Sequence, residues 1–268
     1  VRHLLDSGAI GTPYMAVFHA LSPGDSIFIT PWRHRRELGG FILDMAVHFT
    51  HMIRYQLGNI EEVYGDVRMV EPVRRKSASM SMDYAFYRQR FADMEAEIEA
   101  HAEDTTQAVF KMASGATLNW IVGIGGHGSC GRELILGNRG SIEGFGTRGG
   151  DVRLKRAGRE EIDQTEILDT ERDFQLDPLT THLFPTGVSA GDPVVDLKLI
   201  AIELHELGSA ILTGSPVEVD GICGLKDVAA LYAVFESSRA GRAVKVSEVE
   251  SCQAYAYQAE IDAALGIA

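Results

Sequence analysis

Four short strand-like segments follow one another between residues 105 and 146, and this feature most limits what the chain can fold into. They read "TTQAVFKMA", "ATLNWIVGI", "RELILGN" and "GSIEGFG", and "GDVRLKR" continues the pattern. The turn residues "SG" and "NRG" between pairs of segments are typical of hairpins. Strands joined by such short turns pair antiparallel. The sequence therefore predicts an antiparallel sheet rather than a doubly wound parallel one.

Helical patterns lie before and after these strands. The segment after Gly39-Gly40 has helical spacing and ends at Gly58. Its predicted apolar face consists of Phe41, Leu43, Met45, Val47, His48, Met52, Ile53 and Leu57. Further helices are predicted at residues 193–212, 225–239 and 251–265, and further strands at "TPYMAVFHALS", "IEEVYGDVRMV" and "AVKV". The order of these predicted strands and helices along the chain indicates an α+β fold with a mostly antiparallel open sheet and helices on one face.

With 268 residues and 45% hydrophobic content, the chain can bury a sizeable core as one large domain or as two small ones. We predict a single substrate-binding and oligomerisation domain over residues 1–268. A polar segment at about residues 71–104 interrupts the strand pattern. Within it, "YAFYRQRFADMEAEIEAHAED" has helix-forming composition and an acidic face, so we interpret the segment as an inserted helix or lid. Residues 163–192 give no clear pattern.

Net charge and cysteine use exclude several classes of protein. A formal charge of −13 and a pI near 5.1 argue against a nucleic-acid surface, which needs clustered basic residues. No apolar run is long enough to span a bilayer. Cys130, Cys223 and Cys252 form no C-x-x-C pair, so neither a disulfide framework nor a thiolate zinc site is indicated. A reducing, cytoplasmic location is expected.

Asp44 and His48 lie four residues apart in the predicted helix after Gly39-Gly40, which places both on one face. A carboxylate beside an imidazole makes a proton-transfer unit, because histidine titrates close to neutral pH. The alternative is a histidine bonded to a carbonyl and an aspartate paired at the surface. With His51, the pattern D-x-x-x-H-x-x-H also permits a metal site, but no further ligand is apparent, so none is predicted.

The loop "PWRHRRELGG" concentrates positive charge just ahead of this helix. Arg33, His34, Arg35 and Arg36 could bind a phosphate or a polyhydroxylated ligand, or they could neutralise nearby acidic residues. Trp32 offers a flat ring for a sugar or nicotinamide, although a tryptophan in the core is the commoner case. We take Trp32 and Arg33 as candidate substrate-binding residues.

The segment "GIGGHG" at residues 123–128 has the G-x-G-x-x-G spacing of a dinucleotide fingerprint. A true fingerprint is followed by a helix whose N-terminus receives the pyrophosphate. Here the pattern that follows is strand and turn, so no cofactor site is predicted within this chain. The glycines would let the chain turn between strands. His127 is then either solvent-facing or near a substrate pocket, and we include it among the candidate substrate-binding residues.

Successive blocks of the sequence resemble the C-terminal domain of the Gfo/Idh/MocA oxidoreductases, the family of glucose-fructose oxidoreductase and inositol dehydrogenase. The blocks are "LLDSGAIGTPYMAVF", "WRHRRELGGFILDMAVHFTHMIRYQLGNIEEVYGDV", "AEDTTQAVFKMASGATLNW" and "ELHELGSAILTGSPVEVDGICGLKDVAALYAVFESSRAGRAVKV". Their most specific part is Gly39, Gly40, Asp44 and His48. The family often has Asp where this chain has His51, and commonly a third glycine where it has Phe41.

The resemblance implies a two-domain enzyme in which a separate N-terminal Rossmann domain binds NAD or NADP. Asp44 and His48 then match the catalytic or substrate-orienting pair, and a lysine of the absent domain completes the site. A sugar, cyclitol or related polyol is the expected substrate, and a homo-oligomer through the sheet face is the expected assembly. The chain begins at Val1, so further N-terminal residues are expected in the gene. The alternatives are a non-catalytic binding or assembly module and, last, a metal-dependent hydrolase.

Overall fold

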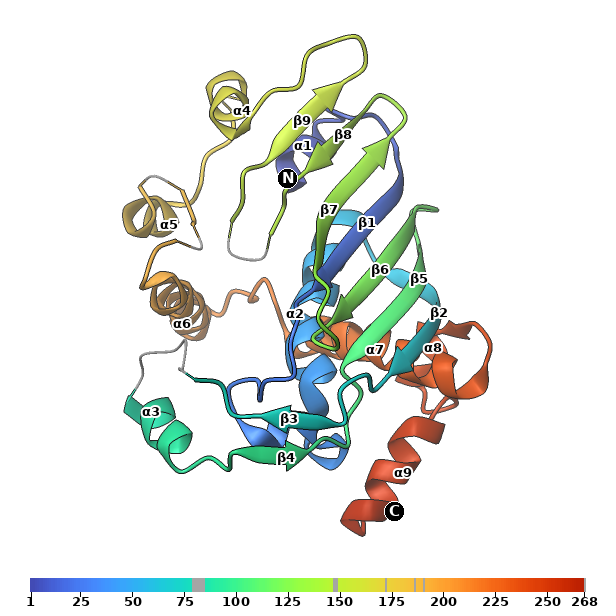
Figure 1. The fold of residues 1–268 in the computed structure, drawn as a ribbon. Coiled ribbons are helices and arrows are strands. Elements are labelled where there is room, and N and C mark those ends of the chain that lie inside the picture. Colours follow the sequence, from blue (N-terminus) through green and yellow to red (C-terminus); the bar gives the residue numbers. More distant parts are fainter. Residues whose placement is uncertain (79–84, 147–148, 172, 186, 190, 268) are drawn as a thin grey trace. The chain divides into compact units, whose positions relative to one another are not determined.

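The computed structural model describes residues 1–78, 85–146, 149–171, 173–185, 187–189 and 191–267. Figure 1 traces the chain, which divides into two compact units. The first unit comprises Val1–Ala16 and Glu133–Leu225, and the second comprises Val17–Arg132 and Lys226–Ala268. The division falls inside the strands β1 (Pro13–Leu21) and β7 (Cys130–Gly137) and inside the helix α7 (Gly221–Ala240).

The second unit is built on a sheet whose strands follow the order β10-β2-β5-β6-β1. The pairs β10–β2, β2–β5 and β5–β6 are antiparallel. β5 and β6 form the hairpin that the "SG" turn predicts, with Phe110 opposite Leu118. The bounds are β2 (Ile60–Arg68), β5 (Thr105–Met112), β6 (Thr117–Gly123) and β10 (Val244–Lys245).

One face of this sheet carries the hydrophobic core. Alternate residues of β5 and β6 are buried there, because side chains of a strand point to opposite faces in turn. The buried Trp120 ring lies 5.2 Å from Phe110 and 5.4 Å from Phe18. Helices α2 (Gly40–Leu57) and α7 cover this face (Figure 1), with Phe49 of α2 4.8 Å from Phe18. The opposite face leaves Tyr64 exposed.

Helix α2 confirms the predicted helix, and Gly58 ends it, but its buried face differs from the predicted one. The buried residues are Gly40, Phe41, Ile42, Ala46, Phe49, Thr50, Ile53 and Leu57. Leu43, Met45 and Val47 are only half-buried, and His48 is exposed. The segment is apolar around most of its circumference, so its periodicity alone does not decide which stripe meets the sheet.

The predicted insertion contains a helix followed by a strand. Helix α3 (Ala85–Ala92) is shorter than predicted, because β4 (Glu97–Glu99) then pairs antiparallel with β3 (Val73–Arg75). Residues 79–84 of the segment lie outside the described residues. The remaining elements of the second unit are η1 (Pro31–His34), η2 (Arg36–Leu38), α8 (Val246–Glu250) and α9 (Ala256–Leu265), where η marks a 3-10 helix.

A buried ion pair joins β3 to the start of β5. Arg74 Nη2 donates to Asp104 Oδ2 at 2.6 Å, and the two side chains are 1% and 3% exposed. Asp104 also accepts from the backbone N–H groups of Val70 and Glu71. Arg74 Nη1 donates to the carbonyl of Ile124. These bonds offset the cost of removing two charges from water.

The first unit contains the part of β7 from Glu133 onward and the two strands that follow it. β7 and β8 (Gly140–Glu143) form the antiparallel hairpin that "NRG" predicts, and β9 (Arg153–Arg156) pairs antiparallel with β8 and so continues the sheet. Residues 163–192, for which no element was predicted, contain α4 (Gln164–Thr170) and α5 (Pro178–Leu183). The unit also contains α1 (Arg2–Asp6) and α6 (Val195–Thr213).

The structure confirms an α+β protein with a large, mostly antiparallel sheet and helices. The assignment of residues 1–268 to one domain, with an insertion at residues 71–104, stays a prediction. Among the described residues, no helix is long and apolar enough to cross a bilayer.

We expect Arg74→Met to lower the free energy of unfolding by about 3–5 kcal/mol, because the buried Asp104 carboxylate loses its charged partner. The matched control is Arg68→Met, whose ion pair with Asp66 is 72% and 50% exposed. That change should cost less than about 1 kcal/mol. Denaturant unfolding measures both values, and equal losses would contradict a stabilising role for the buried pair.

Candidate functional site

The site predicted from sequence lies at the start of α2, where two glycines turn the chain into the helix. Gly39 and Gly40 have φ angles of 104° and 70°, in the left-handed region that side chains rarely adopt. A Cβ on Gly40 would also lie 2.8 Å from the Cβ of Ala102. The "GG" pair therefore sets the direction in which α2 leaves the preceding loop.

Arg33 and Asp44 form an ion pair at this point. Arg33 Nε donates to Asp44 Oδ2 at 2.6 Å, and Arg33 Nη1 donates to Thr30 Oγ1 at 2.7 Å. The guanidinium carbon lies 4.4 Å from the centre of the Trp32 ring, in cation–π range. The Arg33 side chain is only 11% exposed. Its charge is therefore directed at Asp44, and it holds that carboxylate in place at the surface.

His48 lies one helical turn beyond Asp44 and is exposed. The structure pairs Asp44 with Arg33, and within the described part of the chain neither Asp44 Oδ1 nor the His48 ring has a hydrogen bond. Both groups are therefore open to an incoming hydroxyl. An open carboxylate oxygen can accept that hydroxyl's hydrogen bond, and a neutral imidazole can accept its proton.

His51, the third residue of the D-x-x-x-H-x-x-H pattern, contacts a different element. Its Nδ1 lies 2.9 Å from Oδ2 of Asp227 on α7, a carboxylate that is 4% exposed. Arg54 also pairs with Asp227. The structure therefore joins His51 to α7 while Asp44 joins Arg33, and it does not bring Asp44, His48 and His51 onto a common ligand.

The other basic residues of the loop before α2 have separate positions. Arg36 Nη2 donates to Glu103 Oε1 at 2.8 Å, and Glu103 also accepts from Tyr257 of α9. Burial and the neighbouring Glu103 charge raise the pKa of Tyr257. Arg35 is exposed, whereas His34 is buried. Arg33 and Arg36 thus neutralise acidic residues of the chain, which is one of the two interpretations left open by the sequence.

His34 is a buried neutral base beneath the site. Its Nε2 accepts the backbone N–H of Phe28 at 2.9 Å, so this nitrogen carries no proton. Its carbonyl accepts from the backbone N–H groups of His101 and Ala102. Burial, followed by the positive charge of Arg74, lowers the pKa of His34 to about 4. The ring therefore fastens the loop that carries Trp32 and Arg33.

His127 is exposed in the loop between β6 and β7, near the Asp25 carboxylate. The structure does not bring it to Asp44 among the contacts of the described residues. The glycine-rich segment leads into β7, a strand, as predicted. Gly125 allows a close approach, because a Cβ there would lie 2.7 Å from Asp104 Oδ1. These residues do not fit a dinucleotide fingerprint, which needs a helix at this point.

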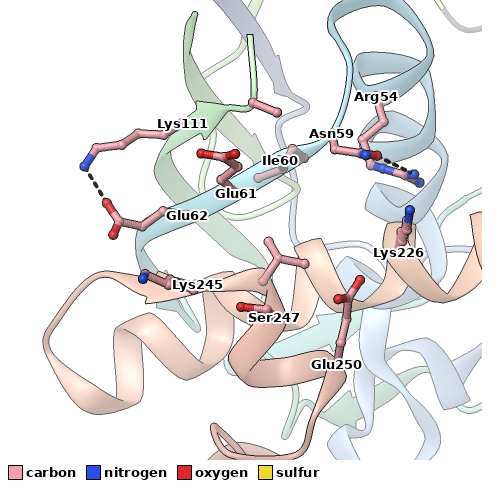
Figure 2. A pocket seen from close by; sticks show the side chains of 12 residues that line it. Arg54, Asn59, Ile60, Glu61, Glu62, Lys111, Lys226, Lys245, Ser247 and Glu250 are labelled. Atoms are coloured by element: carbon pink, nitrogen blue, oxygen red, sulfur yellow. Dashed lines mark hydrogen bonds and ion pairs between the residues drawn. The ribbon is translucent and has the colours of Figure 1, made fainter. Parts of the chain in front are cut away.

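A cavity of about 670 Å³ lies at the other end of α2, beyond Arg54. Figure 2 shows side chains of the sheet edge on one side of it and side chains of α7 and α8 on the other. Lys111 pairs with Glu62, and Arg54 Nη2 donates to Asn59 at 3.1 Å. No local sequence pattern predicts this cavity, because six elements between residues 54 and 250 contribute to its wall.

Comparison with known proteins identifies the family. Residues 1–143 match the GFO/IDH/MocA C-terminal domain. The chain belongs to the GFO/IDH/MocA family. The matched part includes the whole loop of Trp32 and Arg33 and all of α2, so the predicted resemblance is confirmed where the candidate site lies. No curated protein matches the chain.

Solved structures share the fold of this chain. An oxidoreductase from Agrobacterium radiobacter in complex with NAD+, L-tartaric acid and magnesium is 18% identical, with a TM-score of 0.63 over 92% of this chain and 60% of its own. Levoglucosan dehydrogenase with NADH and L-sorbose is 19% identical, with a TM-score of 0.65 over 92% and 62%. Aldose-aldose oxidoreductase from Caulobacter crescentus, complexed with glycerol, is 21% identical, with a TM-score of 0.57 over 91% and 58%. The chain thus spans about 60% of the length of these proteins.

We expect the stability of the protein to fall as the pH decreases from 6.5 towards 4, because the unfolded state binds a proton at His34 that the folded state excludes. Between pH 7.5 and pH 5 this residue should account for a loss of about 2 kcal/mol in the free energy of unfolding. The His34→Gln variant keeps a hydrogen-bond acceptor at this position but has no group that titrates there. Its free energy of unfolding should therefore fall less between pH 7.5 and pH 5. Denaturant unfolding at both pH values measures the difference, and identical losses would contradict the prediction.

Proposed function

We propose that the chain is the substrate domain of an NAD(P)-dependent oxidoreductase that transfers hydride between a nicotinamide cofactor and a sugar, cyclitol or related polyol. The observation that carries the proposal is the pair Asp44 and His48, open on one face of α2 within the part that matches the family. The sugars, polyol and cofactors in the names of the similar structures support the substrate and cofactor class.

In this proposal His48 takes the proton of the substrate hydroxyl during oxidation and returns it during reduction. Asp44 orients the same substrate through Oδ1, while Arg33 holds its other oxygen. Trp32 and Arg33 form the wall of the site next to Asp44. His127, exposed in the loop after β6, stays a candidate substrate-binding residue in this proposal. The carboxylate and imidazole thus bind and deprotonate one hydroxyl group.

The cofactor would supply or accept the hydride, and we propose that a Rossmann domain outside this chain holds it. The residues described here do not fit that role, because β7 follows the glycine-rich segment where a helix is required. We also propose a cytoplasmic location, which the three free cysteines support.

A homo-oligomer through the outward face of the sheet is part of the proposal. Tyr64 of β2 and Val109 of β5 lie directly opposite each other in the register and are 58% and 43% exposed. Such neighbouring apolar side chains on an open sheet face are typical of protein–protein contacts.

We expect His48→Ala to lower the turnover of the complete enzyme by about 100-fold or more, the usual effect of losing a positioned acid–base group. The matched control is His182→Ala, at an exposed histidine of α5 in the first unit, which should leave turnover unchanged. A coupled screen of polyols with NAD+ and NADP+ provides the assay. Unchanged turnover of the His48 variant would remove this residue from the mechanism, and polyol binding without turnover by the wild type would favour a binding module.

We expect Tyr64→Glu to shift the protein towards the monomer, because it places a charge in the proposed contact. Size-exclusion chromatography with light scattering gives the mass of each species. Phe86→Glu, at an exposed aromatic residue of α3, is the control and should leave the assembly unchanged. A wild-type monomer at micromolar concentration would count against the oligomer.

A further inference from the structure

The cavity beyond the end of α2 is large enough for a small molecule. Its volume of about 670 Å³ lies within the range of about 300–1,000 Å³ that is usual for such sites. Every residue that lines it belongs to the second unit. Figure 2 shows Lys226 of α7 and Glu250 of α8 on its helix side and Glu61 of β2 on its strand side. Charged side chains from three elements of one compact unit therefore line this cavity.

Some of the charges in this wall have no counter-charge. Among the described residues, seven charged side chains line the cavity. Four of them already have partners in the chain, namely Arg54, Glu62, Lys111 and Lys245. The side chains of the other three make neither a hydrogen bond nor an ion pair with any described residue, and these are Lys226, Glu61 and Glu250. The wall thus presents one ammonium and two carboxylates to a ligand.

A β-bulge places Glu61 in this wall. The register of β2 and β5 passes from Ile60 opposite Met112 directly to Glu62 opposite Lys111, so Glu61 is an extra residue. An extra residue of this kind bends its strand and re-aims its side chain, and bulges are frequent beside functional sites. The buried Ile60 keeps the strand attached to the core at this point. Glu61 is therefore free to face the cavity while its neighbours remain in the sheet.

The three unpaired charges fit a ligand whose own charges are the reverse. A carboxylate would pair with Lys226, an ammonium next to it would pair with Glu250 on the same side, and a second cation would meet Glu61 across the cavity. Such pairs are stronger in a partly enclosed site, because less water screens them. A simple anion would leave both carboxylates unpaired, and a neutral sugar would leave all three charges unpaired.

We propose that this cavity binds a free α-amino acid with a cationic side chain, such as lysine. The α-carboxylate of the ligand pairs with Lys226 and its α-ammonium pairs with Glu250. The cation at the end of its side chain pairs with Glu61. The three contacts come from α7, α8 and β2, so that the ligand spans the cavity from the helices to the strand.

This site is separate from the proposed chemistry and from the proposed oligomer contact. Asp44 and His48 lie in the first half of α2, whereas the cavity lies beyond its other end. Lys226 belongs to α7, which covers the inward face of the sheet, whereas Tyr64 and Val109 are on the outward face. A contact at the outward face leaves the helix side of the cavity open. Binding needs neither the nicotinamide cofactor nor a polyol, so it can be tested without turnover.

Isothermal titration calorimetry of the chain at pH 7 and low salt compares L-lysine with three analogues that each lack one of its charges. L-Norleucine lacks the cation of the side chain, cadaverine lacks the carboxylate, and 6-aminohexanoate lacks the α-ammonium. We expect each analogue to bind at least about 5-fold more weakly than L-lysine, because each leaves one charge of the wall unpaired. Equal affinities for L-lysine and any of the three would overturn the proposal.

Single substitutions assign each contact. Glu61→Gln should weaken the binding of L-lysine by at least about 5-fold and leave that of L-norleucine unchanged, whereas Lys226→Met and Glu250→Gln should weaken both. The matched control is Lys155→Met, at an exposed lysine of β9 in the first unit, which should leave binding unchanged. Thermal unfolding shows whether each variant is folded. No binding of L-lysine by the wild type, unchanged affinity in the folded variants, or tighter binding of phosphate than of L-lysine would overturn the proposal.

Discussion

The buried ion pair between Arg74 and Asp104 is the interaction on which the arrangement of the site depends. It joins the inserted segment to Asp104, the residue immediately before β5. Arg74 also donates to the carbonyl groups of Gly24 and Ile124. The neighbouring Arg75 exchanges backbone hydrogen bonds with Asp25 and Ile27. The chain that leads into the loop of Trp32 and Arg33 is therefore fixed by the insertion, which acts as a support beneath the site rather than only as an inserted helix or lid.

Ion pairs within the chain explain why few basic residues near the site are available to bind a ligand. Arg33, Arg36 and Arg74 each face a carboxylate, and two of these three contacts hold the loop before α2 in place. Arg33 reaches Asp44 of α2 and Arg36 reaches Glu103, so this loop is tied at two points to other parts of the second unit. Asp44 and His48 are left as polar groups directed outwards, which is the requirement for binding a hydroxylated ligand.

Sequence reasoning succeeded where short-range patterns carry the information. The hairpin of β5 and β6 and the ends of α2 were predictable, because turns and helix caps depend on residues close together in the chain. Two local signals in residues 163–192 were also present but missed. Asp163 and Glu166 form a capping box at α4, and Asp177 precedes Pro178 at the start of α5. The stripe of α2 that is buried could not be predicted, because the helix is apolar on more than one side.

The sequence by itself determined the strands outside the insertion, the longer helices, the family and the placement of Asp44 and His48 on one turn of helix. Only the tertiary structure decided which groups those side chains meet. Arg33 and Asp44 are 11 residues apart, Arg74 and Asp104 are 30 apart, and Arg54 and Asp227 are 173 apart. Local patterns fix backbone conformation within a few residues. Pairing over such separations follows from strand order and from the closure of loops around one core.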